Sequence, residues 1–458
     1  MKKRFWKSLI AAGLAVCMAA GLAACGGANT PGTTATAEKQ GTTAAADQNK
    51  ESQIEIRFAW WGDTKRHEIY NAICDRFEAQ NPDIKITREF GSNQDYWDKL
   101  ATQVAGGNAP DMFGMHPQYV SDYAGRNALA DLQPFIDDGI IDVSKMEPAV
   151  VNSGIVNGTM CMVSQGVTFS NLLVNKTMLD EYGVVYPNYD EDWTWTEFAD
   201  QAKAFAQKAK EAGKEAYLVH DFSNMFSAYR YKARQDGTDQ YTKDGEIAFT
   251  EESVAGWFRY WADLRKAGAI PDGAATTEDY GAPLEEKLFT QGKTAMCRQP
   301  ANQLHLYQAQ MPDSELICLR IPTGDNGERG EYIEGAHFAV SASSSEEKKL
   351  AAAKLIDFFV NTKDSMELFK LEQGIPANTE MAEYVKGLLD DVLSREVEFV
   401  DATMKVAGEG TYAPLGAKSV DTAFRDAHAA VAFEEKTPEA AAADFMKEAQ
   451  EIISKNKK

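Results

Sequence analysis

Residues Gln53–Asp63, QIEIRFAWWGD, give the first indication of the fold class. Apolar and polar residues alternate through it up to Phe58, which is the two-residue period of a β-strand. The alternation stops at two tryptophans followed by Gly62 and Asp63, so the strand runs into a polar loop. Ligands of open α/β sheets bind beyond the carboxyl ends of the strands, so this loop is predicted to form one wall of a binding site. Alternatively, Trp60 caps the core and Asp63 only starts a turn.

Strand and helix patterns alternate after this stretch. Helical spacing of apolar residues over 65–81 leads to a second strand at 84–86, a second helix over 95–105 and a third strand from Asp111. This order predicts a parallel α/β unit with right-handed crossovers. Further along, Leu284–Gln291 is predicted to form a helix that leads into a strand.

The length of 458 residues predicts two or three domains, at about 150 residues each. Hydrophobic residues make up 44% and charged residues 25%, which are ordinary values for a globular protein. Trp257, Trp261 and Leu264 recur at helical spacing, and we expect this stripe to lie in a core rather than to contact a ligand.

The first 24 residues are predicted to be a signal peptide. A basic start, MKKRFWK, precedes the short apolar segment Ser8–Leu22. The following Leu-Ala-Ala-Cys resembles a bacterial lipobox, in which Cys25 is lipidated and becomes the new N-terminus. If Cys25 is instead a bystander, an ordinary signal peptide would still export the chain. No later stretch approaches the roughly 18 apolar residues of a membrane-spanning helix.

Residues 25–51 are predicted to form a flexible linker behind the lipid anchor. Gly26–Lys50 contains no large apolar residue, so it cannot bury enough surface to offset the entropy lost on ordering. Its root-mean-square span would be about 25–30 Å, enough to hold a folded body clear of a membrane surface.

The charge balance excludes one class of partner. The net charge is −22, and removal of the four basic residues of the signal peptide would make it −26. Nucleic acids and anionic lipid surfaces need clustered Lys and Arg, so neither is an expected partner of the folded part.

Four cysteines remain in the body, and their wide spacing resembles neither a metal site nor a disulfide framework, so buried thiols and no metal or other cofactor are expected. They are Cys74, Cys161, Cys297 and Cys318.

Several short motifs follow one another in an order that resembles a known family. They are WWGD, FEAQNPDIKI, DYWDKLATQVAGGNAPDMF, LLVNKTMLDEYGV with DWTWTEFADQA, YWADLRKAGAI, FTQGKTAMC, IPTG, AVSASSSEEKKLAAAKLIDFF and QGIPAN. Each motif alone is weak, but together they cover the chain from about Gln53 onward. The chain resembles the extracellular solute-binding proteins of family 1, the maltose-binding-like sugar-binding lipoproteins that feed ABC importers.

This resemblance implies an α/β, two-lobe fold of the periplasmic-binding-protein type II kind, with a ligand cleft between the lobes and several hinge crossings. Lobe one would comprise residues 52–166 and 323–362, and lobe two residues 167–322 and 363–458. The lobes would close over the solute by hinge motion and present the closed form to the transporter permease. The resemblance further implies a monomer without catalytic residues, held on the outer side of a bacterial cell membrane or in the periplasm.

The candidate ligand-binding residues lie mostly where predicted strands end. A sugar offers apolar C–H faces to aromatic rings and pairs of hydroxyls to carboxylate, amide or guanidinium groups. Tyr412 is included because the resemblance places its stretch, GEGTYAPLG, near the cleft. The candidates are Trp60, Trp61, Asp63, His116, Gln118, Tyr119, Gln165, Thr168, Asn224, Phe226, Arg298, Gln299, Glu334 and Tyr412.

One departure from the family bears on the ligand. Family members often continue the strand at Ala295-Met296 with Gly and then Trp, whereas this chain has the polar run 298–302, RQPAN. The loss of that stacking ring favours a monosaccharide, short oligosaccharide or glycoside over a long maltodextrin. Because Trp60 continues the buried face of the first strand, Trp61 is the stronger candidate for stacking. We expect Trp61→Ala and Arg298→Ala to weaken binding with little loss of stability.

Three alternatives stay open at this point. The ligand could be a solute other than a sugar, or the protein could serve a sensor rather than an importer. A secreted glycosidase would use paired carboxylates, but with 69 Asp and Glu residues no pair is informative. The sequence contains none of the common nucleophile-elbow, zinc-hydrolase or phosphate-loop motifs.

Overall fold

The computed structural model describes residues 53–456, which belong to one compact unit. The predicted signal peptide, Cys25 and the linker lie outside the described residues. No helix within 53–456 is both long and apolar enough to cross a bilayer. The four cysteines of this part are buried and unpaired, as expected from their spacing.

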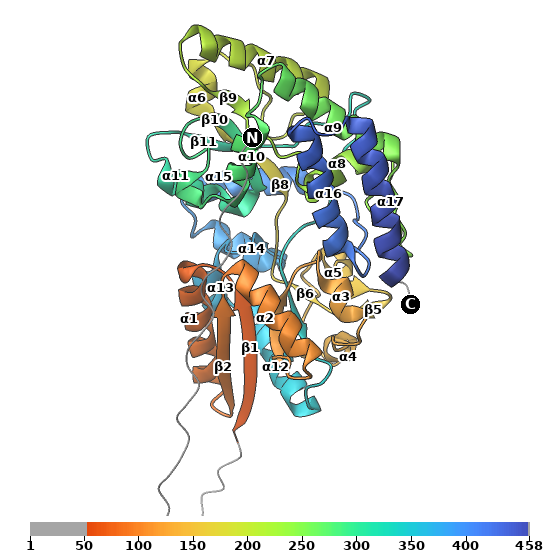
Figure 1. Ribbon diagram of the computed structural model, residues 1–458. Helices are drawn as coiled ribbons and strands as arrows, with labels where there is room; N and C mark the ends of the chain where they lie inside the picture. The colour runs from red at the N-terminus through yellow and green to blue at the C-terminus, as the bar shows by residue number, and fades with distance from the viewer. Residues whose placement is uncertain (1–52, 457–458) are drawn as a thin grey trace, which may run out of the picture. The chain divides into compact units, whose positions relative to one another are not determined.

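The first sheet is built around β1 (Ile54–Trp61), and its strand order is β2-β1-β3-β12-β6. β1 runs parallel to both neighbours, whereas β12 is antiparallel to β3 and β6. Figure 1 shows β1 and β2 side by side in orange. The remaining strands are β2 (Ile84–Gly91), β3 (Met112–Met115), β6 (Val163–Ser164) and β12 (His337–Val340).

Alternation along β1 divides its side chains between two cores. Ile56, Phe58 and Trp60 lie in the core that α1 and α12 cover, whereas Ala59 and Trp61 lie in the core that α2 covers. The predicted strand period is therefore confirmed. The helices of this region are α1 (Thr64–Gln80), α2 (Asn93–Ala105), α12 (Glu346–Asn361) and α13 (Lys363–Phe369).

Short elements follow β3 in the chain and lead to β6. Val120 and Val156 lie in the core that contains Trp61, whereas Leu132 and Val150 lie in the core that contains Trp60. The elements are α3 (Val120–Ala124), α4 (Gln133–Asp137), α5 (Pro148–Asn152) and the antiparallel pair β4 (Ile155–Val156) and β5 (Thr159–Met160).

The second sheet has the strand order β11-β8-β10-β9. β8 is antiparallel to β10 and β11, and β10 is parallel to β9. Leu172, Val174 and Met296 point into a core that also contains Trp257 and Trp261, which confirms the predicted aromatic stripe. The strands are β8 (Ser170–Asn175), β9 (Tyr217–Val219), β10 (Thr294–Pro300) and β11 (Leu316–Leu319).

Helices cover both faces of this second sheet, and α16 and α17 lie side by side in blue in Figure 1. α7 starts at a capping box in which Thr194 and Glu197 satisfy each other's backbone N–H groups. The remaining helices of the described residues are α6 (Lys176–Glu181), α7 (Trp195–Glu211), α8 (Phe226–Gln235), α9 (Glu251–Lys266), α10 (Gly273–Gly281), α11 (Leu304–Gln310), α14 (Thr379–Lys386), which packs on α13, α15 (Asp391–Met404), α16 (Ala417–Ala432) and α17 (Pro438–Asn456), with 3₁₀ turns at Leu284–Glu286 and Ala301–Gln303.

The predicted helix over Leu284–Gln291 is wrong. Only one 3₁₀ turn forms, and the chain continues in turns to Gly292. The backbone N–H of Leu288 donates to the Asp279 carboxylate at 2.7 Å instead of to a carbonyl one turn earlier. This local capture of a backbone donor competes with helix formation.

The chain crosses between the sheets in segments that pair with one another. β7 (Gly166–Val167) pairs with β13 (Ile375–Pro376), and Thr168 forms a bridge with Glu334. Gly374 has a φ of 99°, and a Cβ there would lie 2.3 Å from the Val167 carbonyl oxygen. Glycine is therefore required where two crossing segments approach this closely.

Glu396 is a buried acid on α15, and its side chain is fully shielded from solvent. Neither carboxyl oxygen has a hydrogen-bond partner among the described residues. Burial raises the pKa of Glu396 well above its usual range, and the nearby Glu372 carboxylate raises it further. Burial therefore favours the protonated form of Glu396 in the folded protein.

We predict that Glu396→Gln becomes more stable relative to the wild type as the pH rises from 4 to 8. Below the unfolded-state pKa of about 4.3 both states hold the proton, and above it only the unfolded state ionises. The wild type then loses up to about 1.4 kcal/mol of unfolding free energy per pH unit, until the pH passes the folded-state pKa. Urea unfolding at several pH values measures this difference, and a difference that stays constant would contradict it.

Candidate functional site

Ser170, Glu334, Arg298 and Tyr231 meet where β8 begins and β10 ends, and we call them the Ser170 cluster. The Ser170 backbone N–H and hydroxyl donate to the two Glu334 carboxylate oxygens, each at 3.3 Å. The Tyr231 hydroxyl donates to Glu334 Oε1 at 2.9 Å. Arg298 Nη2 donates to Ser170 Oγ at 2.8 Å. A carboxylate, a guanidinium and two hydroxyls thus converge at one place.

Several polar atoms beside this cluster lack partners. Arg298 Nε, Thr168 Oγ1 and Asn224 Oδ1 are buried and make no hydrogen bond with any described residue. Thr168 is bonded through its backbone to Glu334, and Asn224 precedes Met225, whose sulfur contacts Arg298 Nη1 at 3.7 Å. Buried polar groups in native proteins are nearly always bonded, so these three atoms lack the partners that such groups usually have.

Aromatic rings lie next to the cluster. The Arg298 guanidinium carbon lies 5.9 Å from the centre of the Tyr231 ring. Arg230 lies over the ring of Tyr332 at 3.9 Å. Such contacts between a cation and a ring hold the guanidinium planes in a defined orientation.

Trp61 belongs to an aromatic group on the first sheet. Its ring centre lies 5.2 Å from that of Trp97 and 5.4 Å from that of Tyr96, and Trp97 continues to Tyr119 at 4.3 Å. A Cβ at Gly114 would lie 2.8 Å from Trp61 Cζ3, so glycine is needed for the ring to lie on β3. Only 8% of Trp61 is exposed.

Trp60 points to the opposite face and is almost fully buried. Its Nε1 donates to His67 Nδ1 at 3.2 Å, and its ring packs between those of Phe58 and Tyr70. The alternation that predicted Trp60 to continue the buried face of β1 is confirmed.

Three other candidates have structural partners of their own. Asp63 is the N-cap of α1 and accepts from the Arg66 backbone N–H at 2.9 Å. Gln165 is buried, donates to the His337 carbonyl oxygen at 2.8 Å and accepts from the Tyr70 hydroxyl at 2.5 Å. Phe226 packs in the second core with several aromatic rings. We leave Trp60 and these three residues out of the proposed site.

His116, Gln118 and Tyr119 form the exit of β3, as predicted for a loop at the sheet edge. The Gln118 backbone N–H donates to His116 Nδ1 at 3.2 Å. Burial lowers the pKa of His116 to about 4, so the ring is neutral at pH 7. Burial raises the pKa of Tyr119, and the nearby charge of Asp421 raises it further. Asp421 belongs to α16, so this helix lies close to the loop after β3.

Gln299 lines a separate small cavity in the region of the second sheet, together with His220, Asp279 and Tyr280. The Arg298 backbone N–H donates to His220 Nε2 at 3.0 Å, so the His220 proton lies on Nδ1 and faces Asp279 Oδ2 at 3.2 Å. His220 therefore fixes the backbone of β10 at Arg298. Within residues 53–456 no group of three or more His, Cys, Asp or Glu side chains is arranged to hold a metal ion.

Tyr412 is half-buried against the core that contains Trp61. Its hydroxyl donates to the main-chain oxygen of Ser153. The hydroxyl of this candidate is thus already bonded to the protein.

Sequence reasoning missed Ser170, Tyr231, Tyr332 and Phe90. Tyr231 lies inside a helix and Tyr332 in a turn-rich loop, so neither stands at a predicted strand exit. Phe90 could have been found, because it ends the strand that begins with the alternation at Ile84. It is 46% exposed, and its ring lies 4.4 Å from that of His67 and 5.1 Å from that of Trp60.

Comparison with known families gives one match over most of the chain. Residues 72–399 match the model of a family described as bacterial extracellular solute-binding protein. Among curated proteins, a maltooligosaccharide ABC transporter solute-binding lipoprotein from Streptococcus pneumoniae is 23% identical over 87% of each chain.

Solved structures agree on the fold. A family 1 extracellular solute-binding protein from Alicyclobacillus acidocaldarius is 26% identical, with a TM-score of 0.68 over 87% of this chain and 98% of that one. An ABC substrate-binding protein from Listeria monocytogenes, solved in complex with cycloalternan, is 21% identical, with a TM-score of 0.74 over 88% and 99%. The two-lobe α/β fold expected from the sequence is confirmed.

The burial of Trp61 changes one expectation. We predict that Trp61→Ala lowers the free energy of unfolding by about 3–5 kcal/mol, the usual effect of truncating a buried tryptophan. The expectation of little loss of stability does not fit a buried ring with two aromatic neighbours. Urea unfolding tests this, with the exposed Phe90→Ala as a control that should change stability by less than about 1 kcal/mol. Equal stabilities of Trp61→Ala and wild type would contradict the prediction.

Proposed function

We propose that this chain, which belongs to the bacterial extracellular solute-binding protein family, captures a carbohydrate for an ABC importer. The ligand would be a monosaccharide, a short oligosaccharide or a glycoside. It would be enclosed between two lobes and delivered to the transporter permease. The role is one of binding, without catalysis.

The main support for this proposal is the Ser170 cluster together with the unpartnered polar atoms beside it. Arg298 Nε can donate to a sugar hydroxyl, and Asn224 Oδ1 can accept from one. Glu334 already accepts three hydrogen bonds and is thereby held in place, which favours the recognition of a ligand by preformed groups.

Aromatic rings supply the second requirement of a sugar site. Tyr231 and Tyr332 lie at the cluster, and Tyr119 lies on the loop after β3. The named ligands of two similar proteins, a maltooligosaccharide and cycloalternan, are also carbohydrates. The polar run after Met296 supports a ligand shorter or more polar than a long maltodextrin.

The lobes are proposed with the boundaries predicted from the sequence, with one change. α13 packs against α1 and α12, so we assign residues 363–369 to lobe one. Lobe one then comprises residues 52–166 and 323–369, and lobe two residues 167–322 and 370–458. The paired crossing segments near Gly166 and Gly374 would act as the hinge.

The family is extracellular, and we propose that a lipid on Cys25 anchors this member to the outer side of a bacterial cell membrane or in the periplasm. The Leu-Ala-Ala-Cys sequence supports this anchor, as does the description of the Streptococcus pneumoniae relative as a lipoprotein. We propose that the protein works as a monomer.

A thermal-shift screen tests the ligand class. Ligands that bind only the folded state raise its melting temperature. We predict stabilisation by at least one sugar from a panel of hexoses, maltose, maltotriose and cycloalternan, and none by amino acids, peptides or polyamines. Stabilisation by a peptide or polyamine and by no sugar would reject the carbohydrate assignment.

Arg298 tests the position of the site. We predict that Arg298→Ala weakens binding of the best sugar from the screen by about tenfold or more, because a charged hydrogen bond contributes about 1.5–3 kcal/mol. Arg259→Ala is the matched control, since Arg259 is an exposed arginine of the second sheet's region that pairs with Glu439. Isothermal titration calorimetry measures both affinities. If the two variants bind alike, Arg298 does not contact the ligand.

A further inference from the structure

The segment between α15 and α16, residues 405–416, contacts both proposed lobes, and we call it the strap. The helices at its two ends belong to the proposed lobe two, where α15 packs on β11 and α16 packs on α17 and α9. The middle of the strap leaves that lobe and returns to it. The contacts of the middle of the strap therefore influence how the two lobes lie relative to each other.

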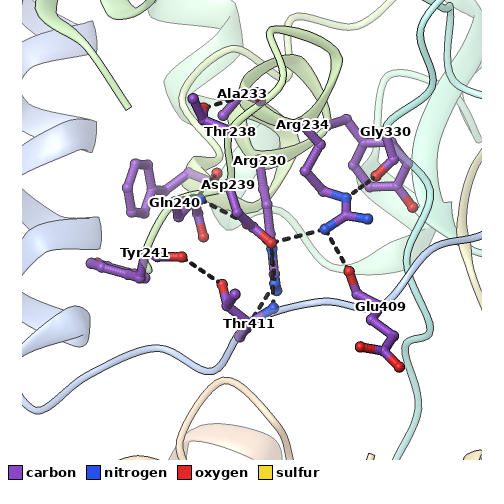
Figure 2. A network of polar contacts seen from close by, with 12 residues as sticks. Arg230, Ala233, Arg234, Thr238, Asp239, Gln240, Tyr241, Gly330, Glu409 and Thr411 are labelled. Atoms are coloured by element: carbon purple, nitrogen blue, oxygen red, sulfur yellow. Dashed lines mark hydrogen bonds and ion pairs between the residues drawn. The ribbon is translucent and has the colours of Figure 1, made fainter. Parts of the chain in front are cut away.

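Hydrogen bonds from lobe two fix the first half of the strap (Figure 2). Arg230 Nη2 donates to the Thr411 carbonyl oxygen at 2.7 Å, and Thr411 donates through its hydroxyl to the Tyr241 carbonyl oxygen at 2.8 Å. Arg234 Nη1 donates to the Glu409 carbonyl oxygen at 2.8 Å. The backbone of the strap is thus bound at several points.

Asp239 is the centre of this network (Figure 2). Its carboxylate accepts two hydrogen bonds from Arg230, at 2.7 and 3.0 Å, and one from Arg234 at 2.9 Å. Paired charges of this kind hold both guanidinium groups in fixed positions. A Cβ at Gly410 would lie 2.8 Å from Arg230 Nη2, so glycine allows the strap to approach the arginine.

The second half of the strap rests on lobe one. The Tyr412 hydroxyl donates to the Ser153 carbonyl oxygen, and its ring packs against the core that contains Trp61. Leu415 lies against Gly125, where a Cβ would be 3.1 Å from Leu415 Cδ1. In the first half of the strap, the Gly408 backbone N–H also donates to the Glu331 carbonyl oxygen of lobe one at 2.9 Å. Polar and apolar contacts therefore both join the strap to lobe one.

We propose that the strap is a latch, and that Tyr412 sets ligand affinity by holding the two lobes together rather than by contacting the ligand. The Tyr412 hydroxyl donates to the Ser153 carbonyl oxygen, and Arg230 and Arg234 bind the backbone that precedes Tyr412. A contact present only in the closed form raises the closed population of the ligand-free protein. Apparent affinity rises with the fraction of the protein in the binding-competent form.

Distance measurements between the lobes test the latch without any ligand. Spin labels are placed on the full chain at Lys354→Cys on α12 and Lys447→Cys on α17, both exposed positions, with Cys17 and Cys25 replaced by Ser. The four remaining cysteines of the folded part are buried. Double electron–electron resonance then gives the populations of closed and open forms.

We expect Tyr412→Phe to raise the open-to-closed ratio about fivefold, the effect of one typical hydrogen bond. Leu415→Ala should shift the ratio in the same direction, and the double variant should shift it further. Tyr186→Phe is the matched control, because it removes a tyrosine hydroxyl that donates to Asp180 within lobe two. It should give the wild-type distances.

Wild-type distances in Tyr412→Phe, Leu415→Ala and the double variant would overturn the latch. An equal shift in Tyr186→Phe would overturn it too, because the effect would then not come from the strap. The latch rests on the two-lobe fold and not on the identity of the ligand. Its failure would leave the thermal-shift result for sugars untouched, and a failed sugar screen would leave these distances untouched.

Discussion

The hydrogen bonds between Ser170 and Glu334 join the two sheets at the place where the site is proposed. Ser170 is the first residue of β8, and Glu334 lies three residues before β12. Because both Glu334 oxygens are used by Ser170, the carboxylate is fixed relative to both sheets. Arg298 and Tyr231 then take their positions from these two residues. Within the cluster, Arg298 is the residue that keeps a buried atom, Nε, without a partner among the described residues.

The fold was predictable where its cause is local. The alternation in β1 is a property of adjacent residues, and it correctly placed Trp60 in one core. The order of strands and helices likewise predicted an α/β fold. The helix over Leu284–Gln291 was wrong because the Asp279 side chain captures a backbone donor there, and no pattern within the segment itself reveals that capture.

The candidate site was predictable only in part, because its contacts join distant segments. Glu334 and Arg298 were found as polar residues beside strands, but their link through Ser170 spans more than a hundred residues of sequence. Tyr231 was missed because it lies inside α8, and only the folded chain brings its hydroxyl to Glu334. Tyr412 was a candidate because the resemblance places its stretch near the cleft, whereas the partner of its hydroxyl depends on how the strap crosses to Ser153.

A crystal structure of the protein with the sugar that stabilises it most would show whether the Ser170 cluster binds the ligand. The proposed site predicts sugar hydroxyls within hydrogen-bond distance of Arg298 and Asn224, next to Glu334 and a tyrosine ring. A sugar bound elsewhere, for example in the cavity beside Gln299 and His220, with the Ser170 cluster unoccupied, would contradict it.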